Sequence, residues 1–384
     1  MVQMMKHNQH NPAFTFHREP IAFNKSTDKA TLQYCLGGTL YMPGTKRIAD
    51  KIVQRALPDM TSMVMCLEDA VEEKSLAAAE ANVLSQLDAL ADAISDRSLA
   101  YDDVPLIFVR VKNPNQFRSF VDRLTQRQAE VLTGFVFPKF DSSNAATYFD
   151  LLNQVSASTR TRLYAMPILE GRTIAYMESR TEELGRIKAV VDAHRDQVLN
   201  VRVGGTDFSA IFGVRRDINT SIYNIIVVCD CLTTILNQFN RVEDDYVVSA
   251  PVWEYFLAYK LEDLNDLLDT ETQHALFKRS RIVNEAVDGL IREVVMDKAN
   301  GFVGKTVIHP SHLRFVNGMQ TVSREEYEDA MQVLGASGGV VKSAKANKMN
   351  EINPHRSWAQ RISMRADAYG VIEDDYACLR LILG

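Results

Sequence analysis

Long apolar runs and an excess of charge of one sign are both missing from this chain of 384 residues. No apolar stretch approaches the roughly 20 residues that a membrane-spanning helix needs, and residues Met4 to His10 lack the apolar core of a signal peptide. We therefore expect a cytoplasmic protein with no membrane partner. The formal net charge is −6 and charges of both signs are mixed along the chain, so no basic surface for nucleic acid is predicted.

Cysteine pairs and several binding motifs are also missing. The five cysteines are an odd number without a Cys-x-x-Cys pair, so we expect reduced thiols in the core. No His-Glu-x-x-His occurs, which argues against a zinc peptidase. Residues Gly301 to Thr306 resemble the end of a phosphate-binding loop, but Ala299 stands where that loop needs glycine. Nucleotide hydrolysis is therefore not predicted.

What the chain does have is a regular alternation of strand and helix patterns. Short apolar runs predict eight strands, at 39–42, 63–67, 106–111, 135–137, 163–169, 199–203, 246–248 and 305–308. Helical spacing of apolar residues lies between them, at 48–53, 77–94, 117–132, 218–239 and 275–295. Eight such units predict an α/β fold, a (β/α)8 TIM barrel over residues 32–318, preceded by an N-terminal extension, 1–31.

Residues 319–384 show a different, helical pattern. A helix is predicted from Ser323 to Leu334, and Gly335 to Gly339 ends it. A polar, flexible segment from Lys342 to Asn350 follows, and then two helices, near 357–369 and 374–383. We expect this C-terminal helical extension to act as a lid over the barrel mouth or as an oligomerisation element reaching a neighbouring subunit.

Charged residues follow four of the predicted strands directly. Glu68 and Asp69, Arg110, Glu170 and Asp207 each stand at or just beyond the end of an apolar run. The carboxyl ends of barrel strands meet at one rim, so these side chains should converge there and suggest a divalent metal and an anionic substrate. Two simpler interpretations remain open: Asp69 and Asp207 could cap helices, and Arg110 could be a salt-bridge partner of Glu68 or Glu170.

An ordered set of motifs carries a family resemblance from about Leu40 to His312. The motifs are Leu40-Tyr41-Met42-Pro43-Gly44, Cys66-Leu67-Glu68-Asp69-Ala70-Val71 with Lys74, Val109-Arg110-Val111, Phe137-Pro138-Lys139, Ile168-Leu169-Glu170, Gly205-Thr206-Asp207-Phe208 and Gly301-Phe302-Val303-Gly304-Lys305 through His309-Pro310. This order resembles the CitE-like proteins, the citrate lyase β-subunit branch of the HpcH/HpaI aldolase superfamily. The tail resembles the TIM-barrel C–C bond lyases associated with tellurium-resistance gene clusters.

The resemblance implies a Mg²⁺-dependent C–C lyase that cleaves a small oxo-acid or hydroxy-acid by retro-aldol or retro-Claisen chemistry. Glu170 and Asp207 would bind Mg²⁺, and Glu68 and Asp69 would orient metal-bound water. Arg110 would bind a carboxylate or the developing enolate oxygen. The remaining substrate contacts would come from Pro43, Gly44, Gly205 and Thr206, whereas Lys139 would shape the rim.

This sequence departs from the family pattern in three places, one of which is a long, charge-rich stretch, 181–200, that should reshape the barrel mouth. Gly37-Gly38 stands where relatives that use coenzyme A esters carry Arg-Ser, which makes coenzyme A doubtful as a partner. In the tail, relatives place an Asp of a Met-x-Asp-x-Pro motif over a neighbouring subunit's barrel, and Glu351 is the candidate here for that acid–base role. A solvated loop glutamate is the alternative. The resemblance implies a homo-oligomer, a trimer or a multiple of one.

Two other functions remain as alternatives. One is a thioester or phosphorylated-sugar aldolase that uses the same metal site. The other is a non-catalytic barrel that serves as a scaffold or metabolite sensor in a stress-related complex. The presence of Glu68, Arg110, Glu170 and Asp207 together favours an enzyme.

Overall fold

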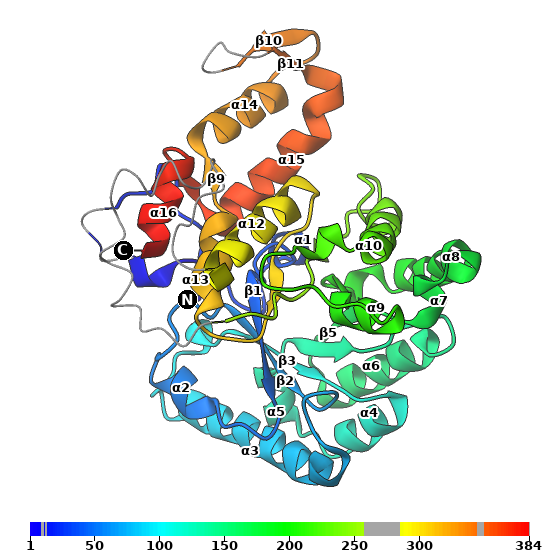
Figure 1. Cartoon of the computed structure of the whole chain (residues 1–384). Helices are drawn as coiled ribbons and strands as arrows, with labels where there is room; N and C mark the ends of the chain where they lie inside the picture. The colour runs from blue at the N-terminus through cyan, green and yellow to red at the C-terminus, as the bar shows by residue number, and fades with distance from the viewer. Residues whose placement is uncertain (9–10, 12–13, 257–284, 344–348, 384) are drawn as a thin grey trace.

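The computed structural model describes residues 1–8, 11, 14–256, 285–343 and 349–383 of the chain. Its centre is an eight-stranded parallel sheet with the order β7-β6-β5-β4-β3-β2-β1-β8 (Figure 1). The strands are β1 Gly38–Pro43, β2 Ser62–Cys66, β3 Leu106–Arg110, β4 Gly134–Phe137, β5 Tyr164–Leu169, β6 Val201–Val203, β7 Val248–Ser249 and β8 Lys305–Val307. Each lies within a residue or two of its predicted position.

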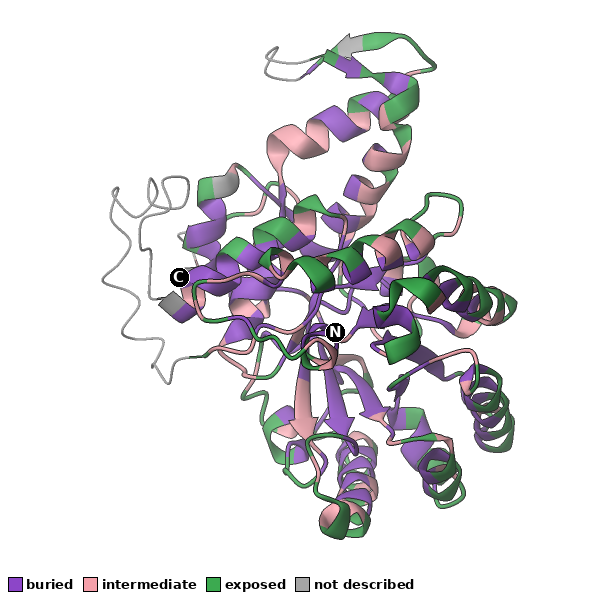
Figure 2. Ribbon diagram, turned by 45° about the vertical axis from the view of Figure 1, so that its right-hand side comes forward, coloured by how far each residue is buried: buried purple, intermediate pink, exposed green. Residues whose placement is uncertain are grey.

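The sheet closes on itself between β7 and β8, as a barrel requires. The amide of Ala250 donates to the Gly304 carbonyl at 3.1 Å, and the Ala250 carbonyl accepts from the Thr306 amide at 3.1 Å. The predicted (β/α)8 barrel is therefore confirmed. The strands are buried on both faces, and Figure 2 shows the surrounding helices buried only on the side that faces them.

Helices and short 3-10 turns connect the barrel strands. The helices are α2 Ala49–Val53, α3 Leu76–Ser95, α4 Pro114–Val121, α5 Gln126–Val131, α6 Ala145–Thr159, α7 Arg172–Ala175, α8 Met177–Ala193, α9 Gly205–Ile211, α10 Ile226–Phe239, α12 Glu285–Ala299 and α13 His312–Met319, and the turns are η2 Glu73–Ser75, η3 Tyr101–Asp103, η4 Arg195–Gln197 and η5 Ile222–Asn224. None of the described helices is long and apolar enough to cross a membrane.

Some predicted helix bounds were wrong. The helix predicted at 117–132 is two helices, because Thr125 begins α5 with a capping box: its hydroxyl accepts from the Gln128 amide, and the Gln128 side chain accepts from the Thr125 amide. The segment predicted at 218–239 is helical only from η5 onward. Of the helix predicted at 275–295, residues 275–284 lie outside the described part of the chain.

The N-terminal extension packs under the amino-terminal end of the barrel. It contains η1 Lys6–Asn8 and α1 Lys29–Leu32. The Lys25 ammonium donates to the Leu132 carbonyl at 2.6 Å, just before β4, and Met4 is buried against Gly37, just before β1. Gly37 has φ +62°, and a Cβ there would lie 2.8 Å from the Met4 methyl. A larger residue does not fit at this position, so the Gly37-Gly38 departure has a structural reason.

The C-terminal extension forms its own small core beside the barrel. It comprises β9 Val322–Ser323, α14 Arg324–Gly335, β10 Val340–Lys342, β11 Met349–Glu351, α15 Ile352–Tyr369, β12 Val371–Ile372 and α16 Asp375–Leu383. The segment predicted to be flexible, 342–350, is framed by an antiparallel pairing of β10 with β11, and its residues 344–348 lie outside the described part. Gly335 to Gly339 has the letters of a Gly-x-Ser-x-Gly nucleophile motif, but it joins a helix to a strand and so lacks that motif's strand-to-helix context.

This extension docks on the amino-terminal end of the barrel, opposite the ends that carry the predicted site. Arg361 donates to Asn240, which precedes β7, and Arg365 donates to the Phe302 carbonyl, which precedes β8. Figures 1 and 2 show α14, α15 and the β10–β11 hairpin projecting away from the strands' carboxyl ends. The expectation that the extension covers the mouth of its own barrel is therefore wrong.

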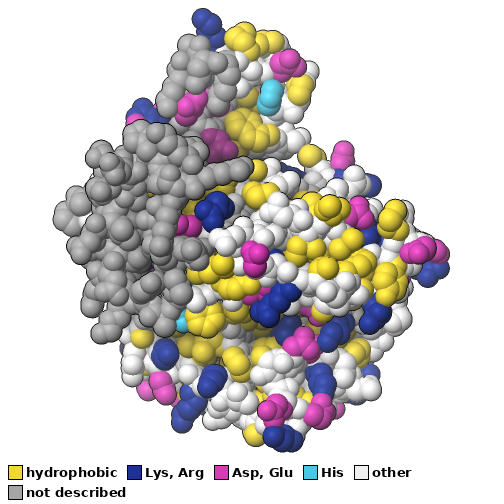
Figure 3. All heavy atoms as spheres, viewed as in Figure 1, with side chains coloured by type: hydrophobic (Ala, Val, Ile, Leu, Met, Phe, Trp, Pro, Cys, Tyr) yellow, Lys and Arg dark blue, Asp and Glu magenta, His cyan; other side chains and the backbone are white. Residues whose placement is uncertain are grey.

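The surface in the view of Figure 3 carries basic and acidic side chains interspersed, with apolar side chains between them. On the hairpin of the extension, the apolar residues Val340 and Met349 are 54% and 59% exposed.

Candidate active site

A cavity of about 400 Å³ opens at the carboxyl ends of the barrel strands. Asp69, Arg110, Glu170 and Asp207 all line it, although they follow or end four different strands. The structure thus brings together the charged residues that the sequence placed after β2, β3, β5 and β6.

Glu170 and Asp207 form a carboxylate pair above Gly204. A Cβ at Gly204 would lie 2.2 Å from Glu170 Oε2 and 3.1 Å from Asp207 Oδ2, so only glycine lets the two carboxylates approach here. The Lys139 amide donates to Glu170 Oε1 at 2.8 Å and fixes this side chain. Helix α9 begins after Gly204 with no side-chain cap, so Asp207 is not serving as a helix cap.

Both carboxyl groups of this pair have unusual protonation behaviour. Burial raises the pKa of Glu170 well above its ordinary value of 4.5, and the negative charge of Asp207 raises it further. Burial also raises the pKa of Asp207. A buried carboxylate and a partly buried one that face each other are stabilised in their charged forms by a cation between them.

The donor set suits a hard cation that keeps most of its water. No group of three or more potential metal-binding His, Cys, Asp or Glu side chains occurs in the described part of the chain. Mg²⁺ is commonly held by only one or two carboxylates, with water in the remaining positions of its octahedron. Glu170 and Asp207 therefore fit Mg²⁺ better than they fit zinc, which takes three or four protein ligands.

Arg110 and Lys139 hold the acidic residues that follow β2. Arg110 Nη2 lies 2.8 Å from Glu68 Oε2 and 3.8 Å from Asp69 Oδ2. Lys139 Nζ lies 2.5 Å from Glu68 Oε1 and 3.3 Å from Asp69 Oδ1. Burial raises the pKa of Glu68, and the charge of Arg110 opposes this. The Arg110–Glu68 salt bridge left open by the sequence is present, and Arg110 still lines the cavity.

Lys139 has a larger part in this site than the sequence indicated. Its backbone has φ +47°, which is uncommon for a residue with a side chain, and this turn directs its amide to Glu170 while its ammonium contacts Glu68 and Asp69. Its position after Phe137-Pro138 placed it at the rim, but the positive φ left no trace in the sequence.

Arg202 is a second cation of the cavity that sequence reasoning missed. It lies in the middle of β6, is 1% exposed, and lines the same cavity as Arg110. Its only signal was a charged residue inside the apolar run Val201 to Val203, where a buried parallel strand normally has none.

The other predicted substrate contacts divide into two groups. Pro43, Gly205 and Thr206 line the cavity, and the Thr206 hydroxyl donates to Glu254 at 2.9 Å. Gly44 is not among the residues that line the cavity, and its amide donates to the Cys66 carbonyl at 2.7 Å. Glu351 is exposed on the C-terminal extension, at the other end of the barrel from its own chain's Glu170 and Asp207.

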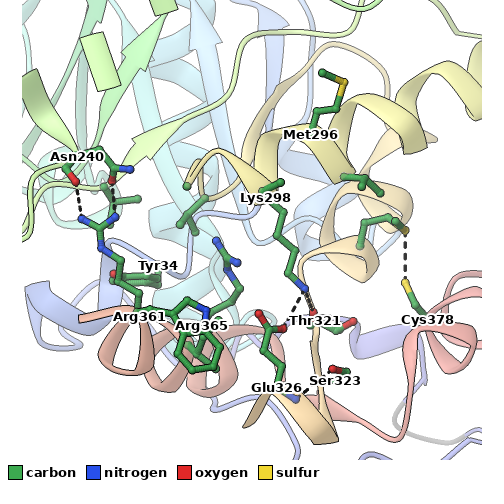
Figure 4. Close-up of a pocket in the computed structure, with 18 of the residues that line it drawn as sticks. Tyr34, Asn240, Met296, Lys298, Thr321, Ser323, Glu326, Arg361, Arg365 and Cys378 are labelled. Atoms are coloured by element: carbon green, nitrogen blue, oxygen red, sulfur yellow. Dashed lines mark hydrogen bonds and ion pairs between the residues drawn. The ribbon is translucent and has the colours of Figure 1, made fainter. Parts of the chain in front are cut away.

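A larger cavity of about 1110 Å³ lies between the amino-terminal end of the barrel and the C-terminal extension (Figure 4). Its wall includes Arg361, paired with Asn240, and Lys298, which donates to the Thr321 carbonyl at 2.6 Å. This cavity is at the opposite end of the barrel from the carboxylate pair.

A carboxylate pair beside a guanidinium, placed at the carboxyl ends of barrel strands, is the arrangement of a (β/α)8-barrel enzyme. A family model described as C–C bond lyases of the TIM-barrel fold matches residues 30–371. The chain belongs to this family. Among curated proteins, no sequence matches it.

Several solved structures are similar to this chain at low identity. CitE from Mycobacterium tuberculosis, in complex with magnesium, acetoacetate and coenzyme A, is 19% identical with a TM-score of 0.49, and the alignment covers 87% of this chain and 99% of that one. RipC from Yersinia pestis is 13% identical with a TM-score of 0.44, over 75% and 95% of the two chains. A lead(II) complex of Haloferax volcanii malate synthase is 12% identical with a TM-score of 0.48, over 72% and 71%.

Proposed function

We propose that this C–C bond lyase is Mg²⁺-dependent and cleaves a small oxo-acid or hydroxy-acid by retro-aldol or retro-Claisen chemistry. The observation that carries the proposal is the close Glu170–Asp207 pair in a cavity that also presents Arg110. A scaffold or sensor would have no use for two opposed carboxylates, one of them buried, whose mutual repulsion costs stability. The thioester alternative is less favoured, because Gly37 leaves no room for the Arg-Ser pair of coenzyme A-binding relatives.

Each charged residue of the site has a separate role in the proposed reaction. Glu170 and Asp207 would hold the metal, and the Lys139 amide keeps Glu170 in place. The bound cation supplies a Lewis acid for the carbonyl beside the breaking bond. Arg110, oriented by Glu68, would bind the substrate carboxylate through its planar fork. Glu68 and Asp69, held by Lys139, would orient water at the metal.

Arg110→Lys tests the carboxylate contact. Lysine keeps the charge but loses the bidentate fork, so affinity for pyruvate and oxaloacetate should fall by about tenfold or more, on the order of 1.4 kcal/mol. Calorimetric titration of the Mg²⁺-loaded protein measures this affinity. Mg²⁺ binding itself should be unchanged, because Arg110 does not ligate the metal.

Arg172→Lys is a matched control for that experiment. Arg172 is exposed at the start of α7, two residues after Glu170, and its guanidinium donates to the Tyr176 hydroxyl at 2.8 Å. The same chemical change there should leave the affinity for both acids unaltered. Equal affinity of Arg110→Lys and the parent for every oxo-acid tested would show that Arg110 serves only its salt bridge with Glu68.

We propose further that Glu351 is the acid–base residue of a neighbouring subunit's site in a homo-oligomer, a trimer or a multiple of one by family resemblance. The extension projects away from its own barrel mouth, so Glu351 can meet a metal site only in another copy of the chain. The exposed Val340 and Met349 beside it provide apolar surface for such a contact.

Mixing two inactive variants tests this arrangement. Glu351→Gln and Glu170→Gln proteins, dissociated and reassembled together, should recover part of the parent's activity, since some sites then combine an intact metal pair with an intact Glu351. Either variant reassembled with itself should stay inactive. A fully active monomer, or no recovery in mixed oligomers of confirmed composition, would remove Glu351 from the mechanism and leave the metal site unaffected.

A further inference from the structure

Arg202 is a buried cation without an acidic partner. Its guanidinium contacts only neutral groups among the described residues: Nη2 donates to Thr306 Oγ1 at 2.8 Å, and Nη1 lies 3.3 Å from Thr39 Oγ1 and 3.4 Å from Asn200 Oδ1. No carboxylate of the described chain lies within ion-pair distance of it. A buried charge that lacks a counter-ion costs several kcal/mol, so an unpaired guanidinium in the wall of a cavity points to a ligand of opposite charge.

Tyr41 lies beside this guanidinium and beside that of Arg110. The guanidinium carbons of Arg202 and Arg110 are 5.5 and 5.7 Å from the centre of the Tyr41 ring. Arg110 has Glu68 as a partner, whereas Arg202 has none of this kind. An anion bound beside this ring would be attracted by both guanidinium groups.

The polar atoms around Arg202 are not satisfied within the described protein. Arg202 Nε and the Tyr41 hydroxyl are both buried, and the guanidinium and the hydroxyl are close enough to interact with each other, but neither of these two atoms has a further partner among the described residues. Both side chains line the cavity, as does Thr306. Burial raises the pKa of Tyr41, so its hydroxyl stays protonated and can donate. Even where the Tyr41 oxygen accepts from the guanidinium, the Tyr41 O–H has no acceptor among the described residues. A buried donor without an acceptor is costly, so this part of the cavity wall indicates that an acceptor is bound there.

We infer that Arg202 and Tyr41 bind a second carboxylate of the substrate, so that the enzyme acts on a dicarboxylic oxo-acid or hydroxy-acid. This inference rests on the proposed function for the first carboxylate, which Arg110 binds beside the metal pair. Arg202 is five residues before Asp207 and points inward from β6, so the second carboxylate lies deeper in the barrel than the metal pair. A cavity of about 400 Å³ has room for a diacid of about four carbons together with a hydrated cation.

The alternative is that Arg202 only fills the barrel interior, held by Thr39 and Thr306. The two roles differ in what they predict for ligands. A filling residue should treat monoacids and diacids alike, whereas a carboxylate-binding residue should favour the diacid. Comparison of malate with lactate isolates this difference, because the two hydroxy-acids differ by one carboxylate group.

The experiment is calorimetric titration of malate and lactate into the Mg²⁺-loaded parent, Arg202→Met and Tyr41→Phe. The parent should bind malate at least about tenfold more tightly than lactate, since a charge-assisted contact to a buried guanidinium is worth that much or more. Arg202→Met should lose this preference, with lactate and Mg²⁺ affinities unchanged. Tyr41→Phe removes only a hydroxyl whose one neighbouring polar group is the Arg202 guanidinium, so it should fold normally and reduce the preference in part.

The outcomes separate this inference from the proposed function. Equal binding of the two acids by the parent, failure of malate to bind it, or a preference that survives in both variants would overturn the inference. If Arg202→Met does not fold, the ratio of malate to lactate affinity in Tyr41→Phe alone tests whether a second carboxylate is bound here. Loss of the preference in the variants together with malate binding that does not depend on Mg²⁺ would support the Arg202 contact and contradict the metal-dependent function.

Discussion

Glu170→Gln should abolish detectable Mg²⁺ binding and turnover without destabilising the metal-free protein. Removal of a residue that only hydrogen-bonds a metal ligand already weakens metal affinity by about 10–100-fold, so loss of one of two direct carboxylates should exceed that. The amide oxygen of the variant can still accept from the Lys139 amide, which preserves the local hydrogen bond. Calorimetric titration of Mg²⁺ and thermal unfolding in a metal chelator measure the two effects, and Asp207→Asn should behave in the same way.

The raised pKa of Glu170 also determines how the stability of the metal-free protein changes with pH. Burial and Asp207 raise the pKa of Glu170 in the folded state, so the folded protein binds a proton here more tightly than the unfolded chain. The contribution of Glu170 to the free energy of unfolding is therefore present below its ordinary pKa of 4.5. It is lost as the pH rises through the higher pKa of Glu170 in the folded protein. Without metal at pH 7, Glu170→Gln should unfold at the same temperature as the parent or higher. A clear drop in its unfolding temperature would mean that Glu170 is a structural residue.

Lys305→Met should cause the largest loss of stability of any substitution considered for this protein. Lys305 at the start of β8 is fully buried, and its ammonium lies 2.9 Å from Glu293 and 2.8 Å from Asp297, both also fully buried on α12. Removing the cation leaves two carboxylates in the interior with less compensation. Breaking a buried pair in this way costs about 3–5 kcal/mol in the free energy of unfolding, measured by denaturant titration.

Arg186→Met is the surface counterpart of that substitution. Arg186 pairs with Glu182 on α8, and both side chains are more than 60% exposed. Exposed pairs contribute about 0–1 kcal/mol, so this variant should remain close to the parent. Equal and small losses in both variants would show that the Lys305 cluster does not fasten α12 to β8.

The barrel and the convergence of its site could be predicted from the sequence. A strand buried on both faces leaves a short, continuous apolar run, and a residue such as Glu170 or Asp207 just beyond that run must lie at the common rim of the strands. The break between α4 and α5 was also visible as Thr125-x-x-Gln128, but the helical spacing of apolar residues continued across it and concealed the boundary.

Other features depend on contacts that sequence patterns do not encode. The pattern of α15 predicts a helix but not the end of the barrel on which it packs, which is decided by pairs such as Arg361 with Asn240, 121 residues apart. Arg202 could be placed in a strand but not inside the barrel beside Tyr41. The reach of Lys139 depends on its positive φ, which its residue type does not favour.

Anomalous diffraction from crystals soaked with Mn²⁺ tests the central claim most directly, because Mn²⁺ takes the same oxygen ligands as Mg²⁺ and can be located by its scattering. A metal bound by the proposed pair would give a peak at about 2.0–2.3 Å from one oxygen each of Glu170 and Asp207, facing Arg110 across the cavity. The peak should disappear in Asp207→Asn crystals soaked in the same way. Ordered Mn²⁺ elsewhere in the molecule with none between these carboxylates, or a peak that persists in Asp207→Asn, would contradict the metal-dependent lyase.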